Sequence, residues 1–227
     1  MKRYERNMDS LSIADMNRLN HSKVCVIGCG GLGGYVVEML GRIGVGYITA
    51  IDGDVFDETN LNRQIVCHTE NISMSKANET KKRMKLVNPH IQVNAIETMI
   101  TESNVLTLIQ GHDVIVDALD NIQTRFIVKY AAEKLNIPMV HGAIAGFYGQ
   151  VATILPGDDI LDLLYPPNSR MGEGVEKRLG NPSFTPPLIA SIQVAEVIKL
   201  LTQRGKLIRN KVLFIDLLNS SFDLVTF

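Results

Sequence analysis

The stretch VIGCGGLGG at residues 26–34 decides how the rest of the chain is interpreted. An apolar run, KVCVIG, begins at residue 23, and a helical pattern, GLGGYVVEMLGRIG, begins at residue 31. Glycines at such a junction let the backbone turn sharply and let a phosphate approach, and the N-terminus of the following helix favours an anion. The stretch therefore predicts a nucleotide-binding turn formed by Gly28, Gly30, Gly31 and Gly33.

Runs rich in Val and Ile alternate with helical periods along the first two thirds of the chain. We expect strands at residues 23–28, 46–52, 91–96, 113–119 and 138–144. We expect helices at residues 31–44, 75–87, 101–110 and 121–135, and one at residues 10–20 capped by Asp9 or Ser10. This alternation predicts an α/β fold, a Rossmann-like, doubly wound and mostly parallel sheet.

The pattern changes after residue 144. The run GFYGQVATIL follows a strand without a crossover helix, which indicates an antiparallel addition to the sheet. Residues 156–187 are rich in Pro and Gly, and we expect them to form a long crossing loop. A helix at 187–203 and strands KVLFID and FDLVTF follow. We interpret residues 1–227 as one domain with three parts: an arm and helix (1–22), a nucleotide-binding half (23–145) and an antiparallel extension (146–227).

Composition excludes several classes of protein. The 227 residues are 45% hydrophobic and 21% charged, which is ordinary for a soluble globular domain. A net charge of −1 lacks the basic excess of nucleic-acid binders, so we expect no nucleic-acid partner. No run approaches the roughly 20 apolar residues that span a membrane, and the N-terminus MKRYERNMDS does not resemble a signal peptide. We therefore expect a cytoplasmic protein, without a disulfide framework because it has three cysteines.

An acidic residue and two cations follow the glycine turn. Asp52 ends the next strand, 24 residues after Gly28, where a carboxylate can accept a hydrogen bond from a ribose hydroxyl. Arg63 follows 11 residues later and Lys76 another 13 residues later. Two cations beside a helix N-terminus suit a triphosphate better than the pyrophosphate of NAD. An NAD-dependent oxidoreductase explains the glycines and Asp52 but leaves both cations without a function.

Six segments occur in an order that resembles the ThiF/MoeB/HesA adenylyltransferases, relatives of ubiquitin-activating enzymes. They are GCGGLGG, IDGDVFDETNLNRQ, SKA, VNPHIQV, DALDN and HGAIAGFYGQV, and the resemblance extends from about residue 4 to the end of the chain. It implies ATP binding and adenylation of the C-terminal glycine of a small ubiquitin-like sulfur carrier protein by a homodimer. A tRNA-modifying dehydratase or a peptide-activating enzyme of the same superfamily, and a non-enzymatic carrier-binding module, are the alternatives.

The resemblance also implies roles for individual residues. Gly31 falls at the phosphate-loop position, Asp52 at the ribose-binding acid and Lys76 at the phosphate-binding lysine. Further matches are Asn60, Arg63 and Gln64 to the N-x-x-R-Q segment, and Asp120 with Asn121 to the D-N pair after the fourth strand. The segment RYERN resembles an arm that reaches the neighbouring subunit's active site, which makes Arg6 its candidate arginine.

The chemistry of adenylation explains the need for such residues. The attacking carboxylate is already ionised near neutral pH, so no general base is needed. The difficulty is repulsion between two anions, which cations placed in advance reduce. We expect Arg63 and Lys76 to hold the phosphates, Asp120 to hold Mg²⁺, Arg6 of the partner subunit to contact pyrophosphate, and Asp54 to orient the polyphosphate through the metal. The alternatives are a surface ion pair for Arg63, solvated side chains for Lys76 and Arg6, and a helix cap for Asp120.

The chain departs from the family in two respects. Many relatives bind zinc through two C-x-x-C pairs, but the first pair's place holds Ile160 and Leu163 and the second pair is missing, so we expect no zinc. Relatives that form a thioester or persulfide carry a cysteine in the crossing loop, which has none here. We expect Cys67 to take no part in the reaction, and we expect the acyl-adenylate to pass to a separate sulfur donor. We expect His141, in a buried strand, to be structural.

Overall fold

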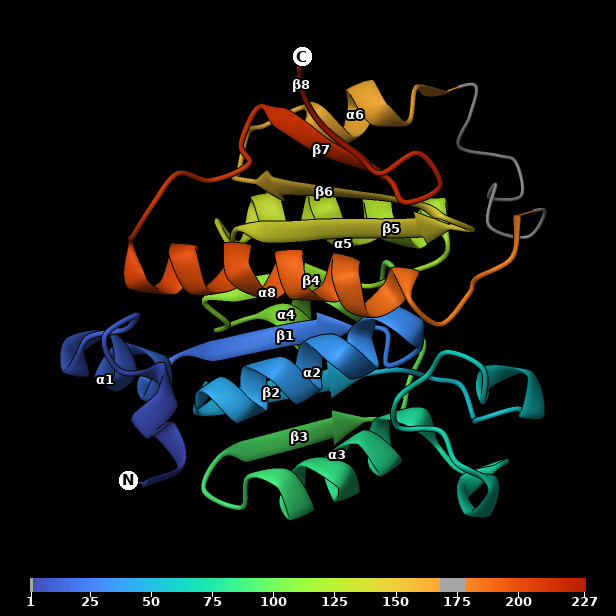
Figure 1. Ribbon diagram of the computed structural model, residues 1–227. Coiled ribbons are helices and arrows are strands. Elements are labelled where there is room, and N and C mark those ends of the chain that lie inside the picture. Colours follow the sequence, from blue (N-terminus) through green and yellow to red (C-terminus); the bar gives the residue numbers. More distant parts are fainter. Residues whose placement is uncertain (1, 168–178) are drawn as a thin grey trace.

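Strands of one mixed sheet form the centre of the molecule. The computed structural model describes residues 2–167 and 179–227, and the sheet in these residues has eight strands in the order β3-β2-β1-β4-β5-β6-β7-β8 (Figure 1). The parallel strands are β1 (Lys23–Ile27), β2 (Tyr47–Ile51), β3 (Gln92–Ile96), β4 (Val114–Asp117) and β5 (Met139–Ala145). The antiparallel strands are β6 (Tyr148–Ile154), β7 (Lys211–Asp216) and β8 (Ser221–Thr226). The predicted fold class is confirmed.

Helices cover both faces of this sheet. One face carries α2 (Gly31–Ile43), α3 (Lys76–Val87) and α8 (Thr185–Thr202), which lie in front of the sheet in Figure 1. The other carries α4 (Val105–Ile109), α5 (Ile122–Lys134) and α6 (Ile160–Leu164). Alternate side chains of β1 point to opposite faces, so Val24 and Val26 join the first apolar cluster while Cys25 and Ile27 join the second. No helix in the described ranges is long and apolar enough to cross a membrane.

The N-terminal part differs from the predicted helix at 10–20. Residues 2–7 form a short 3-10 helix, η1 (Lys2–Asn7), and the helix that follows, α1, spans Ile13–His21. Ser12 begins it, because its hydroxyl accepts from the Asp15 N–H at 3.1 Å while the Asp15 carboxylate accepts from the Ser12 N–H at 2.9 Å. Neither Asp9 nor Ser10 is the cap. Because these reciprocal bonds make Ser12 the cap, the helix begins two residues later than it would with a cap at Ser10.

Two further segments differ from the predicted boundaries. The predicted helix at 101–110 is shorter, because the Asn104 side chain accepts from the Thr101 N–H at 2.8 Å and holds a turn there, so that α4 begins at Val105. The crossing segment at 156–187 is not loop throughout, since α6 lies near its start. Its residues 168–178 lie outside the described part of the chain. The helix predicted at 187–203 begins at Thr185, with prolines in its first turn, where proline is tolerated.

The parallel strands bring the sequence motifs to one edge of the sheet. The glycine turn follows β1, Asp52 follows β2, and the segment containing Asp120 follows β4. In Figure 1 the arrowheads of β1 and β3 point to the same side, where α2 begins. Ligands of open α/β sheets bind outside the carboxyl ends of the strands. This edge is therefore where a candidate site must be built.

Candidate active site

Close packing explains two of the four glycines in the turn. Gly28 has a φ of +94°, and a Cβ there would lie 2.6 Å from the carbonyl oxygen of Ala118. A Cβ on Gly33 would lie 1.7 Å from the carbonyl oxygen of Gly28. A side chain at Gly33 would push α2 away from the turn that follows β1, and one at Gly28 would push this turn away from the segment that follows β4. The contact with Ala118 also places the segment that carries Asp120 next to the turn.

The other two glycines face the candidate site. Gly30 precedes the first residue of α2, and a Cβ there would lie 3.5 Å from the side-chain nitrogen of Gln64. A Cβ on Gly31 would lie 3.7 Å from Cδ of Arg63. No side-chain cap binds the N–H groups at the start of α2. These N–H groups and the positive end of the helix make the turn suited to an anion.

Asp52 supports the glycine turn directly. One carboxylate oxygen accepts from the Cys29 N–H at 2.7 Å, and the other accepts from the Asp54 N–H at 2.8 Å. Burial raises the pKa of Asp52, although these two hydrogen bonds and the charge of Lys76 oppose the rise. A carboxylate has about four lone-pair positions, so each oxygen retains capacity for a further donor such as a ribose hydroxyl.

The segment 60–64 presents a buried amide to the turn. Asn60 is buried, and its side-chain oxygen accepts from the Asp57 N–H at 3.1 Å, so this residue closes the local turn. Gln64 is 5% exposed, and its side-chain oxygen has no hydrogen-bond partner among the described residues. An unsatisfied buried polar atom is costly, and such atoms frequently mark a site that a ligand or water completes. Gln64 beside Gly30 therefore fits a ligand at the turn.

The two predicted cations both lie beside the glycine turn. Arg63 donates to the Thr59 carbonyl at 3.0 Å and to the Asn62 side chain at 2.9 Å, while its aliphatic part lies near Gly31. Lys76 begins α3 and its side chain is only 11% exposed. Its ammonium lies 2.9 Å from the carboxylate of Asp54. The positive charge of Lys76 is therefore held close to the turn and to Asp52, whose pKa it lowers in part.

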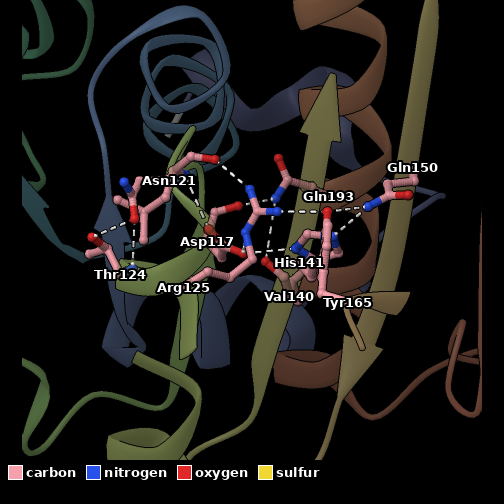
Figure 2. Close-up of polar contacts among 10 residues, drawn as sticks. Asp117, Asn121, Thr124, Arg125, Val140, His141, Gln150, Tyr165 and Gln193 are labelled. Carbon is pink, nitrogen blue, oxygen red and sulfur yellow. Dashed lines mark hydrogen bonds and ion pairs between the residues drawn. The ribbon is translucent and has the colours of Figure 1, made fainter. Parts of the chain in front are cut away.

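Asp120 and Asn121 occupy different environments. Asn121 caps α5, because its side-chain oxygen accepts from the Thr124 N–H at 2.9 Å (Figure 2). The alternative interpretation of Asp120 as this cap is therefore wrong. Asp120 is exposed, and among the described residues none forms a hydrogen bond or ion pair with its carboxylate. Mg²⁺ typically takes one or two carboxylates and completes its shell with phosphate oxygens and water. The carboxylate of Asp120 fits that requirement.

A buried polar network surrounds Asp117, three residues before Asp120, and the sequence does not predict it. The carboxylate of Asp117 lies 2.9 Å from Nε of Arg125 and 2.8 Å from Nδ1 of His141 (Figure 2). Burial alone would raise the pKa of Asp117, but the charge of Arg125 and the hydrogen bond from His141 hold it below its usual value. Burial and the same arginine lower the pKa of His141. Asp117 and Arg125 form an ion pair, and His141 is fully buried and bonded to Asp117, as a structural histidine would be.

Arg6 lies far from the glycine turn of its own chain. Its helix η1 is tied to the C-terminal ends of α2 and α3, since Asn7 donates to the Ile43 carbonyl at 3.1 Å and Arg3 donates to the Asn88 side chain at 2.5 Å. The glycine turn lies at the other end of α2, about 20 Å away for a helix of 13 residues. Arg6 is exposed and does not join the site of its own chain.

Within the described residues, neither the cysteines nor other possible metal ligands form a second metal or nucleophilic centre. The described residues contain no group of three or more His, Cys, Asp or Glu side chains that could hold a metal ion. Burial raises the pKa of Cys25 to about 12 and also raises the pKa values of Cys29 and Cys67. These thiols are protonated near neutral pH and therefore poor nucleophiles. Ile160, at the place of the first zinc-binding pair, is buried in an apolar cluster.

Comparison with known proteins gives the relatives of this chain and the solved structures that share its fold. The ThiF family model matches residues 4–227. The SAMP-activating enzyme E1 of Haloferax volcanii is 33% identical over 230 residues, which cover 100% of this chain and 85% of that protein. The sulfur carrier protein adenylyltransferase of Thermus thermophilus is 33% identical over 235 residues, covering 100% and 87%. The structure of E. coli MccB with AMPCPP and MccA has the same fold, with a TM-score of 0.82 at 22% identity, covering 99% of this chain and 71% of MccB.

Proposed function

This chain belongs to the ThiF family, as its motifs predicted, and we propose that its adenylyltransferase activity acts on the C-terminal carboxylate of a small ubiquitin-like sulfur carrier protein. ATP is the nucleotide, and pyrophosphate is released. The observation that carries this proposal is the position of Arg63 and Lys76 beside a helix N-terminus that no side chain caps. A triphosphate supplies the anion that such an arrangement lacks.

The proposed binding mode follows the positions of these side chains. Asp52 accepts from the ribose, the N–H groups at the start of α2 bind phosphate oxygens, and Arg63 and Lys76 contact the phosphate chain. The unpaired side-chain oxygen of Gln64 accepts a hydrogen bond from an O–H or N–H group of the nucleotide, because phosphate oxygens offer it no donor. Asn60 contributes by holding the turn that presents Arg63, since its side chain already closes that turn. Asn121 acts in the same indirect way by fixing the start of α5 after Asp120.

The reaction needs electrostatic stabilisation more than proton transfer. The carrier carboxylate, ionised at neutral pH, attacks the α-phosphorus; the bond from this phosphorus to the bridging oxygen breaks, and pyrophosphate leaves with the electron pair. Positive groups placed in advance, Arg63 and Lys76, stabilise the charge that develops on the phosphate oxygens. Removing one such group commonly costs about 3 kcal/mol of transition-state stabilisation. Asp120 is the residue that would hold Mg²⁺, which neutralises part of the polyphosphate charge when bound.

Two features of the chain support the proposed homodimer and the proposed separate sulfur donor. Arg6 is exposed and separated from its own glycine turn, so we propose that it completes the site of a second subunit in a homodimer. The segment 156–187 contains no cysteine, and burial raises the pKa values of the three thiols of the chain. We propose that a separate donor therefore supplies sulfur to the acyl-adenylate, and that no zinc is needed.

A thermal unfolding experiment with the purified chain tests the nucleotide assignment. ATP with Mg²⁺ at 100 times its dissociation constant should stabilise the folded state by about 2.7 kcal/mol, because it binds only that state. NAD at the same concentration should leave the melting temperature unchanged. Stabilisation by NAD and not by ATP would contradict the proposal and favour an oxidoreductase.

A further inference from the structure

The helix α6 is fixed firmly against α5. Two of its residues, Ile160 and Leu161, are buried in the apolar cluster on the face of the sheet that α4 and α5 cover. A third, Asp162, forms an ion pair at 2.5 Å with Lys129 of α5, whose side chain is 9% exposed. Charge-assisted contacts of this kind, combined with apolar burial, leave a short helix little freedom. The residue that follows α6, Tyr165, therefore has a defined position.

Tyr165 contacts the buried network through its hydroxyl group. The hydroxyl oxygen accepts from Nη1 of Arg125 at 2.7 Å and from the side-chain nitrogen of Gln150 at 2.5 Å (Figure 2). The Arg125 guanidinium carbon also lies 5.3 Å from the centre of the Tyr165 ring. Arg125 and Lys129 are four residues apart on α5, so one face of this helix makes both polar contacts with the region of α6.

The same guanidinium group holds the backbone that leads to Asp120. Its Nε lies 2.9 Å from the Asp117 carboxylate, and its Nη2 donates to the Leu119 carbonyl at 2.5 Å. The Leu119 N–H in turn donates to the Asp117 carboxylate at 3.1 Å. Residues 117–119 are thus arranged around one arginine side chain, and Asp120 is the next residue. Because none of the described side chains holds the Asp120 carboxylate, these backbone contacts determine where it lies.

We propose that Tyr165 is a positioning residue for Asp120, acting through Arg125. The crossing segment then takes part in arranging the metal-binding carboxylate from outside the nucleotide site. This inference rests on the proposed function, since it assigns Asp120 to Mg²⁺. Loss of the tyrosine hydroxyl would leave one guanidinium N–H without this acceptor and would loosen residues 117–119. A displaced carboxylate weakens metal binding without removing the nucleotide contacts of Asp52, Arg63 and Lys76.

The test compares Tyr165→Phe with Tyr130→Phe and the wild type. Tyr130 lies on α5, is 52% exposed, and its hydroxyl has no hydrogen bond within the described ranges, so the same substitution there is a matched control. Calorimetric titration with ATP, in Mg²⁺ and in EDTA, gives the gain in affinity that the metal provides. Hydrogen exchange of a peptide covering residues 117–121, measured without any ligand, reports the backbone directly.

We expect Tyr165→Phe to reduce the gain from Mg²⁺ by about fivefold, the effect of losing the one hydrogen bond that reaches Arg125, and to accelerate exchange of the 117–121 peptide. ATP affinity in EDTA should stay within about twofold of wild type, and Tyr130→Phe should match wild type throughout. An unchanged gain from Mg²⁺ in Tyr165→Phe would overturn the inference, even if exchange is faster, because Tyr165 would then be purely structural. A wild type that binds no ATP in either buffer would instead overturn the proposed function.

Discussion

The ammonium group of Lys76 lies 2.9 Å from the carboxylate of Asp54, and the two side chains differ strongly in exposure. The lysine side chain is 11% exposed, whereas that of Asp54 is 52% exposed. The cation is therefore fixed at the glycine turn, while its partner is free to reorient in solvent. A phosphate group can replace Asp54 beside Lys76 without leaving a buried acid unpaired. This relationship makes the positive charge available to a nucleotide.

Replacing Lys76 by methionine should lower carrier-dependent exchange of pyrophosphate into ATP by about 100-fold, because one preorganised cation is lost from the phosphate site. The fold should persist, since Asp54 is half exposed and the methionine fills similar space. Lys82→Met is the control, because Lys82 lies on the same helix with its side chain 68% exposed. If Lys76→Met keeps an exchange rate within threefold of wild type, Lys76 does not contribute to the reaction.

Replacing Arg63 by alanine should remove most exchange activity and most of the stabilisation by ATP. Its side chain lies near Gly31 and bonds to Thr59 and Asn62, so its loss should remove the proposed phosphate contact rather than core packing. Arg42→Ala provides the comparison, because Arg42 is exposed and its partner Glu38 keeps a second arginine, Arg83. Near-normal turnover of Arg63→Ala, measured by the same exchange assay, would show that the assignment is wrong.

The buried His141 predicts a pH dependence of stability. Burial and the charge of Arg125 lower its pKa below the usual 6.5, so between these two values the unfolded chain binds a proton that the folded chain does not. The contribution of His141 to stability is complete above about pH 6.5 and falls as the pH is lowered towards the folded pKa, by up to about 1.4 kcal/mol per pH unit.

Urea unfolding at pH 7, 6 and 5 measures this slope. The decrease in the free energy of unfolding from pH 7 to pH 5 should be smaller in His141→Asn than in wild type, whatever the absolute stability of the variant. The exposed His90 gives the control, and His90→Asn should keep the wild-type slope. Equal slopes in wild type and His141→Asn would mean that His141 is not held neutral by its surroundings.

Mixing two inactive variants tests whether Arg6 acts in the neighbouring subunit. In a dimer of Arg6→Ala with Arg63→Ala, one site has both arginines and the other has neither. An equal mixture that exchanges subunits should therefore recover about a quarter of the wild-type exchange rate, because half the dimers are mixed and each has one intact site. Recovery should fail when both substitutions are in one chain and that chain is mixed with either single variant. No recovery in the first mixture would show that Arg6 does not act in the neighbouring subunit's site.

The sequence was most informative where local chemistry fixes the backbone. The alternation of strands with helices predicts the parallel sheet that the structure shows, and close packing excludes other residues at Gly28 and Gly33. The glycines and Asp52 predict the edge at which the candidate site lies. The start of α1 was misplaced, because Ser10 and Ser12 are both plausible caps and only the reciprocal bonds between Ser12 and Asp15 distinguish them.

The buried network could not be predicted, because its members are distant in the chain. Asp117 lies 24 residues from His141, and Tyr165 lies 40 residues from Arg125. Local periodicity does not show which side chains of different elements meet. One signal was present: an acidic residue inside the apolar run DVIVDAL, which needs a buried partner. The exposed Asp120, three residues later, matches the D-N pair, and that match carries no information about the side chains that hold its backbone.

The most direct test of the central claim is exchange of labelled pyrophosphate into ATP with a ubiquitin-fold carrier protein that ends in Gly-Gly. The account predicts exchange when the final glycine has a free carboxylate and none when the same carrier ends in an amide, since the carboxylate oxygen is the attacking atom. Equal exchange with both carriers would contradict the account.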